Sequence, residues 1–346
     1  MCLQIIGYME SYRIGDQMKY IDISKFLKPN IYFNFFVGGR GIGKTFSADK
    51  MLVKNEKEFL FLRTTSTELD MSCDSNEFGK VDKRVQTKRI NKNMWGIYRN
   101  DALIGSGCAL SIFKNLRGVN FDDVEFIFQD EFIPEVNARK LIKDEATAWF
   151  NMIETVNRNR ELQGKKPVIY IGCSNANEIY NPYFVELGLV AELEQMLNKG
   201  EQRLIDYERG LQVVLLEPTE EFVQAKSQTA LYKLAKGTKF EQMSLNNQFS
   251  FNDFTMVKKM NVTGYQAFIQ YGDLILYSKK NSDSLVVKKN NGKRLKVYYD
   301  ISDQVEKDLF IYKFKDLFYE AFLKKSIYFE NYEAKRKTFD IFKIKC

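Results

Sequence analysis

The sequence FFVGGRGIGKTFSADK, residues 35 to 50, decides the fold of the chain. An apolar run leads into four glycines within six positions, and Lys44 and Thr45 follow directly. Residues 38 to 45 fit G-x-x-x-x-G-K-[ST], between a predicted strand at 30–39 and a predicted helix, which is the context that the motif requires. The pattern therefore predicts a phosphate-binding loop at the start of a helix.

Each residue type in this loop suits a triphosphate. Backbone N–H groups of the loop and of the helix N-terminus would surround a β-phosphate, and glycine allows the necessary dihedrals and the close approach. We expect Lys44 to reach the β and γ oxygens and the Thr45 hydroxyl to ligate Mg²⁺. The predicted cofactors are ATP and Mg²⁺, and the predicted nucleotide-binding residues of the loop are Gly38, Gly39, Arg40, Gly41, Ile42, Gly43, Lys44 and Thr45. A structural turn without a ligand is the alternative.

A carboxylate at the end of a second buried strand would complete the metal site. The segment 123–131, DVEFIFQDE, has this form, because Asp130 closes the apolar run and Glu131 follows it. We predict that Asp130 holds Mg²⁺ through water and that Glu131 polarises the attacking water, whereas simple helix capping is the alternative. Ser174 and Asn175 end another predicted strand, where they could sense a γ-phosphate or only form a turn.

Five short apolar runs separated by helical stretches indicate an α/β fold. Turn signals bound each run, as expected of buried parallel strands, and the runs span residues 30–39, 58–64, 123–131, 166–176 and 210–218. A parallel sheet with helices on both faces is the expected core of residues 1–218. Such a sheet, together with the phosphate-binding loop and the two acidic residues that end the third run, predicts a P-loop ATPase of the ASCE (additional strand, catalytic glutamate) class.

Two further regions follow the predicted core. Residues 219–255 are polar and helical, have a Pro-Thr start followed by two glutamates, and contain Gly237 as a stop signal, which predicts a lid or linker. Residues 256–346 contain alternating strands joined by Gly-Asp, Asn-Ser-Asp and Asn-Asn-Gly turns, followed by a helix over about 303–325. This pattern predicts a separate α+β domain.

Composition excludes several classes of protein. The chain has 346 residues, of which 45% are hydrophobic, and it has no run of about 18 apolar residues, so we expect a globular protein without a membrane partner. Its first residues lack the features of a signal peptide, which favours a cytosolic location. The five cysteines are scattered and histidine is absent, so disulfides, zinc sites and histidine-based catalysis are not expected.

Phosphoryl transfer usually needs an arginine that offsets charge in the transition state. Residues 138–163 predict a helix whose apolar stripe is formed by Ile142, Ala146, Trp149, Ile153 and Val156. Arg160 continues this stripe, whereas Arg158 lies about 200° from Val156 and is expected to point outward. Arg158 could enter a neighbour's nucleotide site in a ring or remain solvated, and Arg40 inside the loop could act in cis instead.

Positive charge is uneven along the chain. Residues 253–346 contain 19 Lys and Arg against 12 Asp and Glu, so the whole net charge of +7 lies there, which suggests a polyanionic partner or a solubilising surface. The segment 79–93 is also basic and predicts either a DNA-contacting hairpin or an exposed strand pair with ordinary surface lysines. Its candidate nucleic-acid residues are Lys80, Lys83, Arg84, Lys88, Arg89 and Lys92.

Five segments resemble, in this order, the DNA-encapsidation ATPases of small tailed phages of the φ29-like type. They are GGRGIGKT, FIFQDEFI, TVNRNRE, SNANEIYNPYF and GTKFEQMSLNNQF, across roughly residues 30–250. The resemblance implies an ATP-driven pentameric ring that threads double-stranded DNA into an empty capsid. It also implies a location in the host cytoplasm and, transiently, at the portal vertex. The motifs of the family fall on residues 38–45, Asp130, Glu131 and Arg158.

The same resemblance implies a C-terminal domain similar to the RNase H-like nuclease of large terminases, but without cutting activity. The residues agree, because two-metal cutting needs clustered carboxylates and Asp273, Asp283 and Asp300 fall in turns or at one strand end. Such a domain could dock to DNA or to a structural packaging RNA. The alternatives are a terminase-like motor with an active nuclease, a helicase or DNA pump with the same core, and a binding module that uses nucleotide only as a switch.

Overall fold

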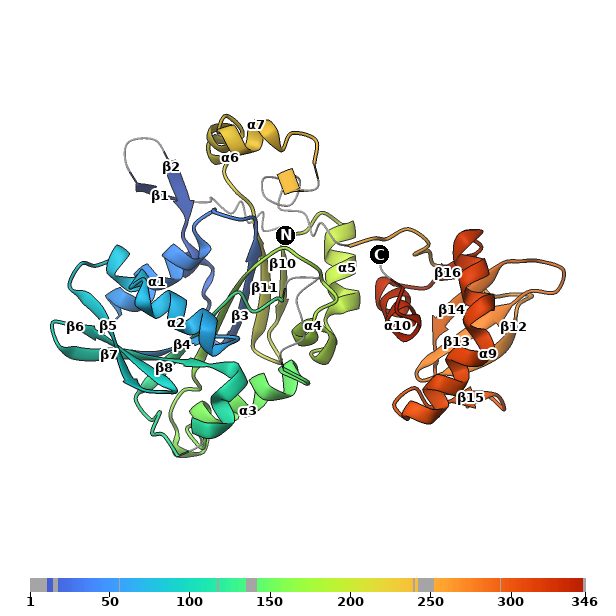
Figure 1. Ribbon diagram of the computed structural model, residues 1–346, viewed down its shortest axis with the longest axis horizontal. Helices are drawn as coiled ribbons and strands as arrows, with labels where there is room; N and C mark the ends of the chain where they lie inside the picture. Colours follow the sequence, from blue (N-terminus) through green and yellow to red (C-terminus); the bar gives the residue numbers. More distant parts are fainter. Residues whose placement is uncertain are drawn as a thin grey trace, which may run out of the picture. The chain divides into compact units, whose positions relative to one another are not determined.

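The computed structural model describes residues 11–14, 18–55, 57–116, 118–134, 142–238, 240–241, 252–292 and 294–344. The chain divides into two compact units (Figure 1). The first unit comprises residues 1–187 and 196–250, and the second comprises residues 188–195 and 251–346. The division at residue 250 lies near the expected start of the C-terminal domain, although the short segment 188–195 groups with the second unit.

A nine-stranded sheet forms the centre of the first unit, in the order β10-β11-β3-β9-β8-β4-β7-β6-β5. The strands from β11 to β7 are parallel, whereas β10, β6 and β5 pair antiparallel with their neighbours. The expected parallel core is therefore present, but the complete sheet is mixed because hairpins extend it at both edges.

The five predicted strands all occur, as β3 (Phe33–Gly38), β4 (Glu58–Arg63), β8 (Val124–Asp130), β9 (Ile169–Asn175) and β11 (Leu211–Leu216). The remaining strands of the sheet are β5 (Val85–Asn91), β6 (Met94–Arg99), β7 (Ala102–Ala109) and β10 (Arg203–Asp206). A separate hairpin consists of β1 (Ser11–Ile14) and β2 (Met18–Ile21).

The central strands are apolar at successive positions because both faces of the sheet are covered. Phe35 and Phe36 on β3 are both fully buried, and neighbouring side chains on a strand point to opposite faces. On one face the ring of Phe35 lies 6.0 Å from Trp149, and on the other Phe36 joins a core cluster with Leu52. The helices of this core are α1 (Lys44–Lys54), α2 (Ser66–Asp74), α3 (Glu145–Asn157) and α4 (Pro182–Glu186). Most of α5 (Val190–Asn198) groups with the second unit.

The helix predicted over residues 138–163 is shorter than expected. It begins after Asp144, whose carboxylate accepts from the Thr147 N–H, and it ends where Arg158 adopts a φ of 44°. Trp149 and Val156 are buried, as the predicted stripe requires. The prediction relied on helical spacing to turn Arg158 outward. That argument is wrong, because α3 ends at Asn157 and Arg158 lies beyond it.

Short helices accompany the core and follow it. The 3₁₀ helices are η1 (Ile23–Phe26), η2 (Glu77–Lys80), η3 (Leu110–Leu116) and η4 (Glu161–Gln163). The expected helical lid contains α6 (Glu220–Ser227) and α7 (Ala230–Leu234), and Gly237 follows with a φ of 80°. Phe222 of α6 is buried and belongs to the same core cluster as Ile42 of the glycine-rich loop. The last part of the predicted lid, residues 242–251, lies outside the described residues.

The second unit is an α+β structure, as predicted, with a five-stranded sheet in the order β15-β12-β13-β14-β16. The strands are β12 (Gln266–Tyr271), β13 (Leu274–Ser278), β14 (Leu285–Lys289), β15 (Tyr298–Tyr299) and β16 (Ile327–Phe329). The helices α9 (Gln304–Leu323) and α10 (Tyr332–Phe342) bury aromatic rings against this sheet. No described helix has the length and apolar character needed to cross a membrane.

The topology of the large sheet brings distant residues together. In the strand register Gly38 pairs with Asn175, and Asp130 pairs with Cys173. Arg63 ends β4, whose Leu62 pairs with Gln129 of β8. Four neighbouring parallel strands thus deliver polar groups to one edge, the carboxyl edge at which open α/β sheets bind ligands.

Candidate nucleotide-binding site

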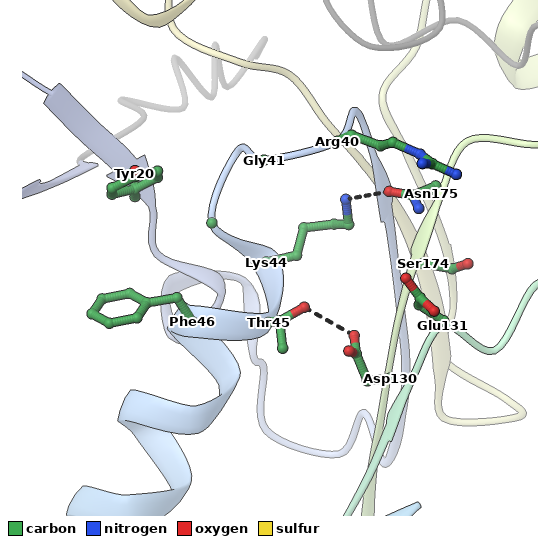
Figure 2. Close-up of a pocket in the computed structure, with 11 residues that line it drawn as sticks. Tyr20, Arg40, Gly41, Lys44, Thr45, Phe46, Asp130, Glu131, Ser174 and Asn175 are labelled. Atoms are coloured by element: carbon green, nitrogen blue, oxygen red, sulfur yellow. Dashed lines mark hydrogen bonds between the residues drawn. The ribbon is translucent and has the colours of Figure 1, made fainter. Parts of the chain in front are cut away.

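A pocket of about 450 Å³ lies at this carboxyl edge (Figure 2). It is formed by the glycine-rich loop, the start of α1 and the ends of β8 and β9. The lining residues are Tyr20, Arg40, Gly41, Gly43, Lys44, Thr45, Phe46, Asp130, Glu131, Ser174 and Asn175. Most residues predicted for nucleotide and metal binding therefore share one cavity, and the aromatic side chains of Tyr20 and Phe46 are additions that the sequence did not single out.

The loop between β3 and α1 requires glycine at two positions. Gly41 and Gly43 have φ values of 79° and 96°, in the left-handed region where a Cβ is strained. A Cβ on Gly43 would also lie 2.7 Å from the Cβ of Tyr20. Successive N–H groups in such a loop, followed by a helix N-terminus, form a concave site for an anion. The loop thus has the backbone form that phosphate binding needs.

Lys44 is buried and hydrogen-bonded to its own loop. Its Nζ donates to the carbonyl oxygens of Gly38 and Gly39 at 2.9 and 2.7 Å, and to Oδ1 of Asn175 at 3.3 Å. Burial lowers the pKa of Lys44 to about 8, although the charges of Cys173 and Asp130 act in the opposite direction. An anionic phosphate in the pocket would favour the protonated amine.

Thr45 and Asp130 form the candidate metal site. The Thr45 hydroxyl donates to Oδ1 of Asp130 at 3.0 Å, and the carboxylate is 7% exposed. Burial raises the pKa of Asp130, and the positive charge of Arg63 counteracts part of this effect. A hydroxyl and a carboxylate are hard oxygen ligands of the kind that Mg²⁺ uses together with water and phosphate. The chemistry of the pair therefore fits Mg²⁺.

Arg63, which contacts the two acidic residues of the pocket, is a third residue that the sequence analysis missed. Its two terminal nitrogens pair with Asp130 and with Glu131, each at 2.8 Å, and its side chain is 11% exposed. Glu131 itself is 57% exposed and has a φ of 56°, which is unusual for a residue other than glycine. One signal was available: Arg63 closes the apolar run at 58–64, and the ends of neighbouring parallel strands meet. In this structure the predicted catalytic carboxylate is held by Arg63.

The two predicted sensor residues have different surroundings. Figure 2 shows Asn175 directed toward the amine of Lys44. The Ser174 hydroxyl instead accepts from the backbone N–H of Ile133 at 3.1 Å and is buried. Asn175 is thus placed to respond to the group that binds at Lys44, whereas Ser174 stabilises the segment that follows Glu131.

Arg158 lies at the opposite end of the sheet from this pocket. It donates to the carbonyl oxygen of Val119 at 2.7 Å and pairs with Asp122 at 3.6 Å, and both partners precede β8. β8 runs from Val124 to Asp130, so its start and Asp130 are six residue spacings apart, a distance of about 20 Å at 3.3 Å per residue. Arg158 is therefore too far away to reach the pocket of its own chain. Arg40 is exposed and lines that pocket.

The basic residues predicted to contact nucleic acid divide into two groups. The segment 79–93 contains the end of η2, the strand β5 and the turn after it. It therefore supplies one arm of the β5–β6 hairpin at the edge of the sheet, and β6 follows it. Three of the side chains are ion-paired: Arg84 with Asp82, Lys88 with Asp101, and Arg89 with Asp70. The other three have no ion-pair partner among the described residues, and they are Lys80, Lys83 and Lys92.

Comparison with protein families gives one match over almost the whole chain. A model described as Podovirus DNA encapsidation protein (Gp16) matches residues 15–345. The DNA packaging proteins of Bacillus phages PZA and phi29 are each 28% identical to this chain over 248 residues, which cover 70% of this chain and 70% of theirs.

Two solved structures share the fold. The bacteriophage Phi-29 viral genome packaging motor assembly gives a TM-score of 0.68 at 21% identity, over 94% of this chain and 99% of that chain. The Phi-28 gp11 DNA packaging motor gives a TM-score of 0.62 at 20% identity, over 94% and 98%. The arrangement of strands and helices described above is therefore similar to that of known packaging proteins.

The pKa of Lys44 predicts a pH dependence of phosphate binding. Below a pH of about 8 the amine carries its proton, and above it the free protein must take up a proton when an anion binds. Affinity for ADP, whose phosphate no longer titrates in this range, should therefore fall as pH rises from 8, by up to about tenfold per unit. Fluorescence titration with labelled ADP from pH 7 to 9.5 measures this.

Lys44→Met is the control for that titration, because Asp130, Glu131 and Lys226 also contribute charge around the amine. The variant should bind weakly and should lack the decrease above pH 8. A wild-type affinity that stays constant over this range would contradict the assignment.

Proposed function

Because the chain belongs to the podovirus DNA encapsidation protein family and packages phage DNA into a capsid, we propose that it is the ATP-hydrolysing subunit of a ring motor. The motor drives double-stranded DNA through the portal of a preformed capsid. One observation carries the enzymatic part: Lys44, Thr45, Asp130 and Glu131 line a single pocket behind a glycine loop of the phosphate-binding type. This is the set of groups that hydrolysis of a nucleoside triphosphate needs.

Residues of the pocket have separate roles in ATP hydrolysis. Thr45 and Asp130 would hold Mg²⁺, which supplies charge stabilisation at the phosphate oxygens when it is bound. When the nucleotide binds, the Lys44 amine donates its hydrogen bonds to phosphate oxygens instead of to the carbonyl oxygens of Gly38 and Gly39. Glu131 orients the attacking water and accepts its proton, and this requires that its carboxylate leave Arg63. Asn175, whose side chain accepts a hydrogen bond from Lys44, senses the terminal phosphate.

Substitution of Glu131 tests the catalytic assignment. Glu131→Gln should keep ATP affinity close to that of the wild type and lower kcat by about 10²-fold or more, because the amide cannot accept the proton. Equilibrium nucleotide binding and phosphate release measure the two quantities. Glu125→Gln, at a surface carboxylate of the same strand that pairs with Lys57, should change neither. Unchanged turnover in Glu131→Gln would remove Glu131 from this role.

Arg158 is proposed to act on the neighbouring subunit. The distance of about 20 Å along β8 excludes it from its own pocket, and its side chain is 41% exposed with the guanidinium anchored at Val119. An arginine supplied from another molecule can offset transition-state charge. A homo-oligomeric ring, with five subunits in our proposal, would place each Arg158 near the site of the next subunit.

Mixed rings test this assignment. Arg158→Ala and Glu131→Gln should each be inactive alone, because one lacks the arginine and the other lacks the base. Mixing the two proteins should restore part of the DNA-dependent hydrolysis, since an intact site then meets an intact arginine. Arg209→Ala is a matched control, because Arg209 is also 41% exposed, donates to a carbonyl and pairs with an aspartate. Action of Arg158 within its own chain would give a mixture no more active than its components.

DNA is proposed to contact the basic edge formed by η2 and the β5–β6 hairpin. Contact with phosphates requires available positive charge and no reading of bases. Lys80, Lys83 and Lys92 supply such charge, because they are exposed and have no ion-pair partner among the described residues. The three ion-paired residues, Arg84, Lys88 and Arg89, contribute less because acidic neighbours already offset their charge.

The salt dependence of DNA binding distinguishes these two groups. The triple alanine variant of Lys80, Lys83 and Lys92 should reduce the slope of log affinity against log salt by about 0.9 for each DNA phosphate that the protein no longer neutralises. The triple alanine variant of Arg84, Lys88 and Arg89 is the matched control and should have the smaller effect. If neither variant alters the slope or the DNA-stimulated hydrolysis, the hairpin does not contact DNA.

The second unit is proposed to be a nuclease-like domain that does not cut. Its strands β14-β13-β12-β15 have the order 3-2-1-4 of an RNase H-like sheet, although β16 adjoins β14. Asp273 and Asp300 follow paired strands at one end, whereas Asp283 precedes β14 at the other. No group of three or more metal-ligating side chains occurs among the described residues.

The same proposal extends to the partners of the motor. The excess of basic residues after position 252 suits a polyanion, either DNA or a structural packaging RNA. Assembly at the portal vertex from a pool in the host cytoplasm follows from the function of the family.

A further inference from the structure

A lysine of the lid contacts the glycine-rich loop from outside the pocket. Lys226 on α6 donates from Nζ to the carbonyl oxygen of Arg40, 186 positions earlier in the chain. We propose that Lys226 is a positioning residue, which fixes the Arg40–Gly41 peptide for phosphate binding and links the lid to the occupied loop. The identity of the ligand rests on the proposed ATPase function, whereas the contact itself does not.

The geometry of the peptide group explains how a contact outside the pocket acts inside it. The described backbone has no cis peptide bond, and in a trans peptide the C=O and N–H point in opposite directions. Because the Arg40 carbonyl points toward Lys226, which is not among the pocket-lining residues, the N–H of Gly41 points away from Lys226. Gly41 lines the pocket, and its φ of 79° is one that glycine adopts readily.

Two lysines donate hydrogen bonds to different carbonyl oxygens of the loop. Lys44 donates to Gly38 and Gly39, and Lys226 donates to Arg40, so three successive carbonyl oxygens accept from ammonium groups. Lys44 has to leave its carbonyls to reach a phosphate. Lys226 lies outside the pocket lining and can keep its hydrogen bond when a ligand is bound. The fixed orientation of the loop in the loaded state therefore depends on Lys226.

The position of Lys226 is itself restrained by packing. Its Nζ lies 5.0 Å from the ring centroids of both Phe222 and Tyr232, a distance at which aromatic faces attract a cation. Phe222 is buried in the core, and its backbone N–H is capped by the Thr219 hydroxyl. The ammonium is thus held between α6, α7 and the loop, so a change at the loop is transmitted to both lid helices.

Lys226→Met tests the inference, because it removes the donor and keeps an unbranched apolar side chain between the two rings. In the nucleotide-free full chain, amide hydrogen exchange of residues 38–43 should become faster. The KM for MgATP should rise about tenfold, as expected for one lost hydrogen bond to a charged group, with kcat nearly unchanged. Lys226→Arg should restore most of both values. Lys233→Met, at an exposed lysine of α7, is the matched control and should resemble the wild type.

Two results would overturn the inference. In the first, Lys226→Met has the same amide hydrogen exchange of residues 38–43 and the same KM as the wild type. In the second, kcat falls while KM is unchanged, which would place Lys226 in the chemical step. If Lys226→Met fails to fold, as judged by circular dichroism, Lys226→Ala, which also lacks a donor, replaces it with the same expectations. If the wild type shows no saturable affinity for MgATP, the ATPase proposal fails, and the exchange measurement still decides whether Lys226 fixes the loop.

Discussion

The bridge from Arg63 to Asp130 and Glu131 is the interaction on which the nucleotide site depends. Two adjacent carboxylates follow one another at the end of β8, and one of them is buried. Burial disfavours the ionised form of Asp130, and its pKa is raised even with Arg63 beside it. Without the guanidinium the pKa of Asp130 would be higher still. The same arginine holds Glu131, so the charge that favours the ionised form of Asp130 also restrains the proposed catalytic base.

The order of strands makes this bridge possible. β4 lies next to β8 in the sheet, and β8 lies next to β9, although long segments of chain separate them. The carboxyl ends of these strands therefore deliver Arg63, Asp130 and Asn175 to the edge at which the glycine-rich loop begins. Arg158 contacts the segment that precedes β8, at the amino ends of these strands and away from the pocket, and for this reason we propose that it acts on a neighbouring molecule.

The lid also restrains the conformation of the glycine-rich loop. Lys226 and Phe222 contact the loop and its core from one short helix, so the orientation of three backbone carbonyls is shared between α1 and α6. Such an arrangement relates the state of the phosphate site to the position of the two lid helices, α6 and α7. A motor needs a relation of this kind, because energy from hydrolysis has to become movement.

The sequence by itself determined the glycine-rich loop, the five central strands, the acidic pair and the turn-linked strands of the second unit, because these features rest on local spacing and on burial of both faces. Strand order, the end of α3 and the ion pairs of the basic hairpin came only from the tertiary structure. Arg63 and Lys226 show the reason. Arg63 contacts Asp130, 67 positions away, and Lys226 contacts Arg40, 186 positions away, and no local pattern encodes such contacts. Arg158 shows the same limit, because its place depends on where the helix stops.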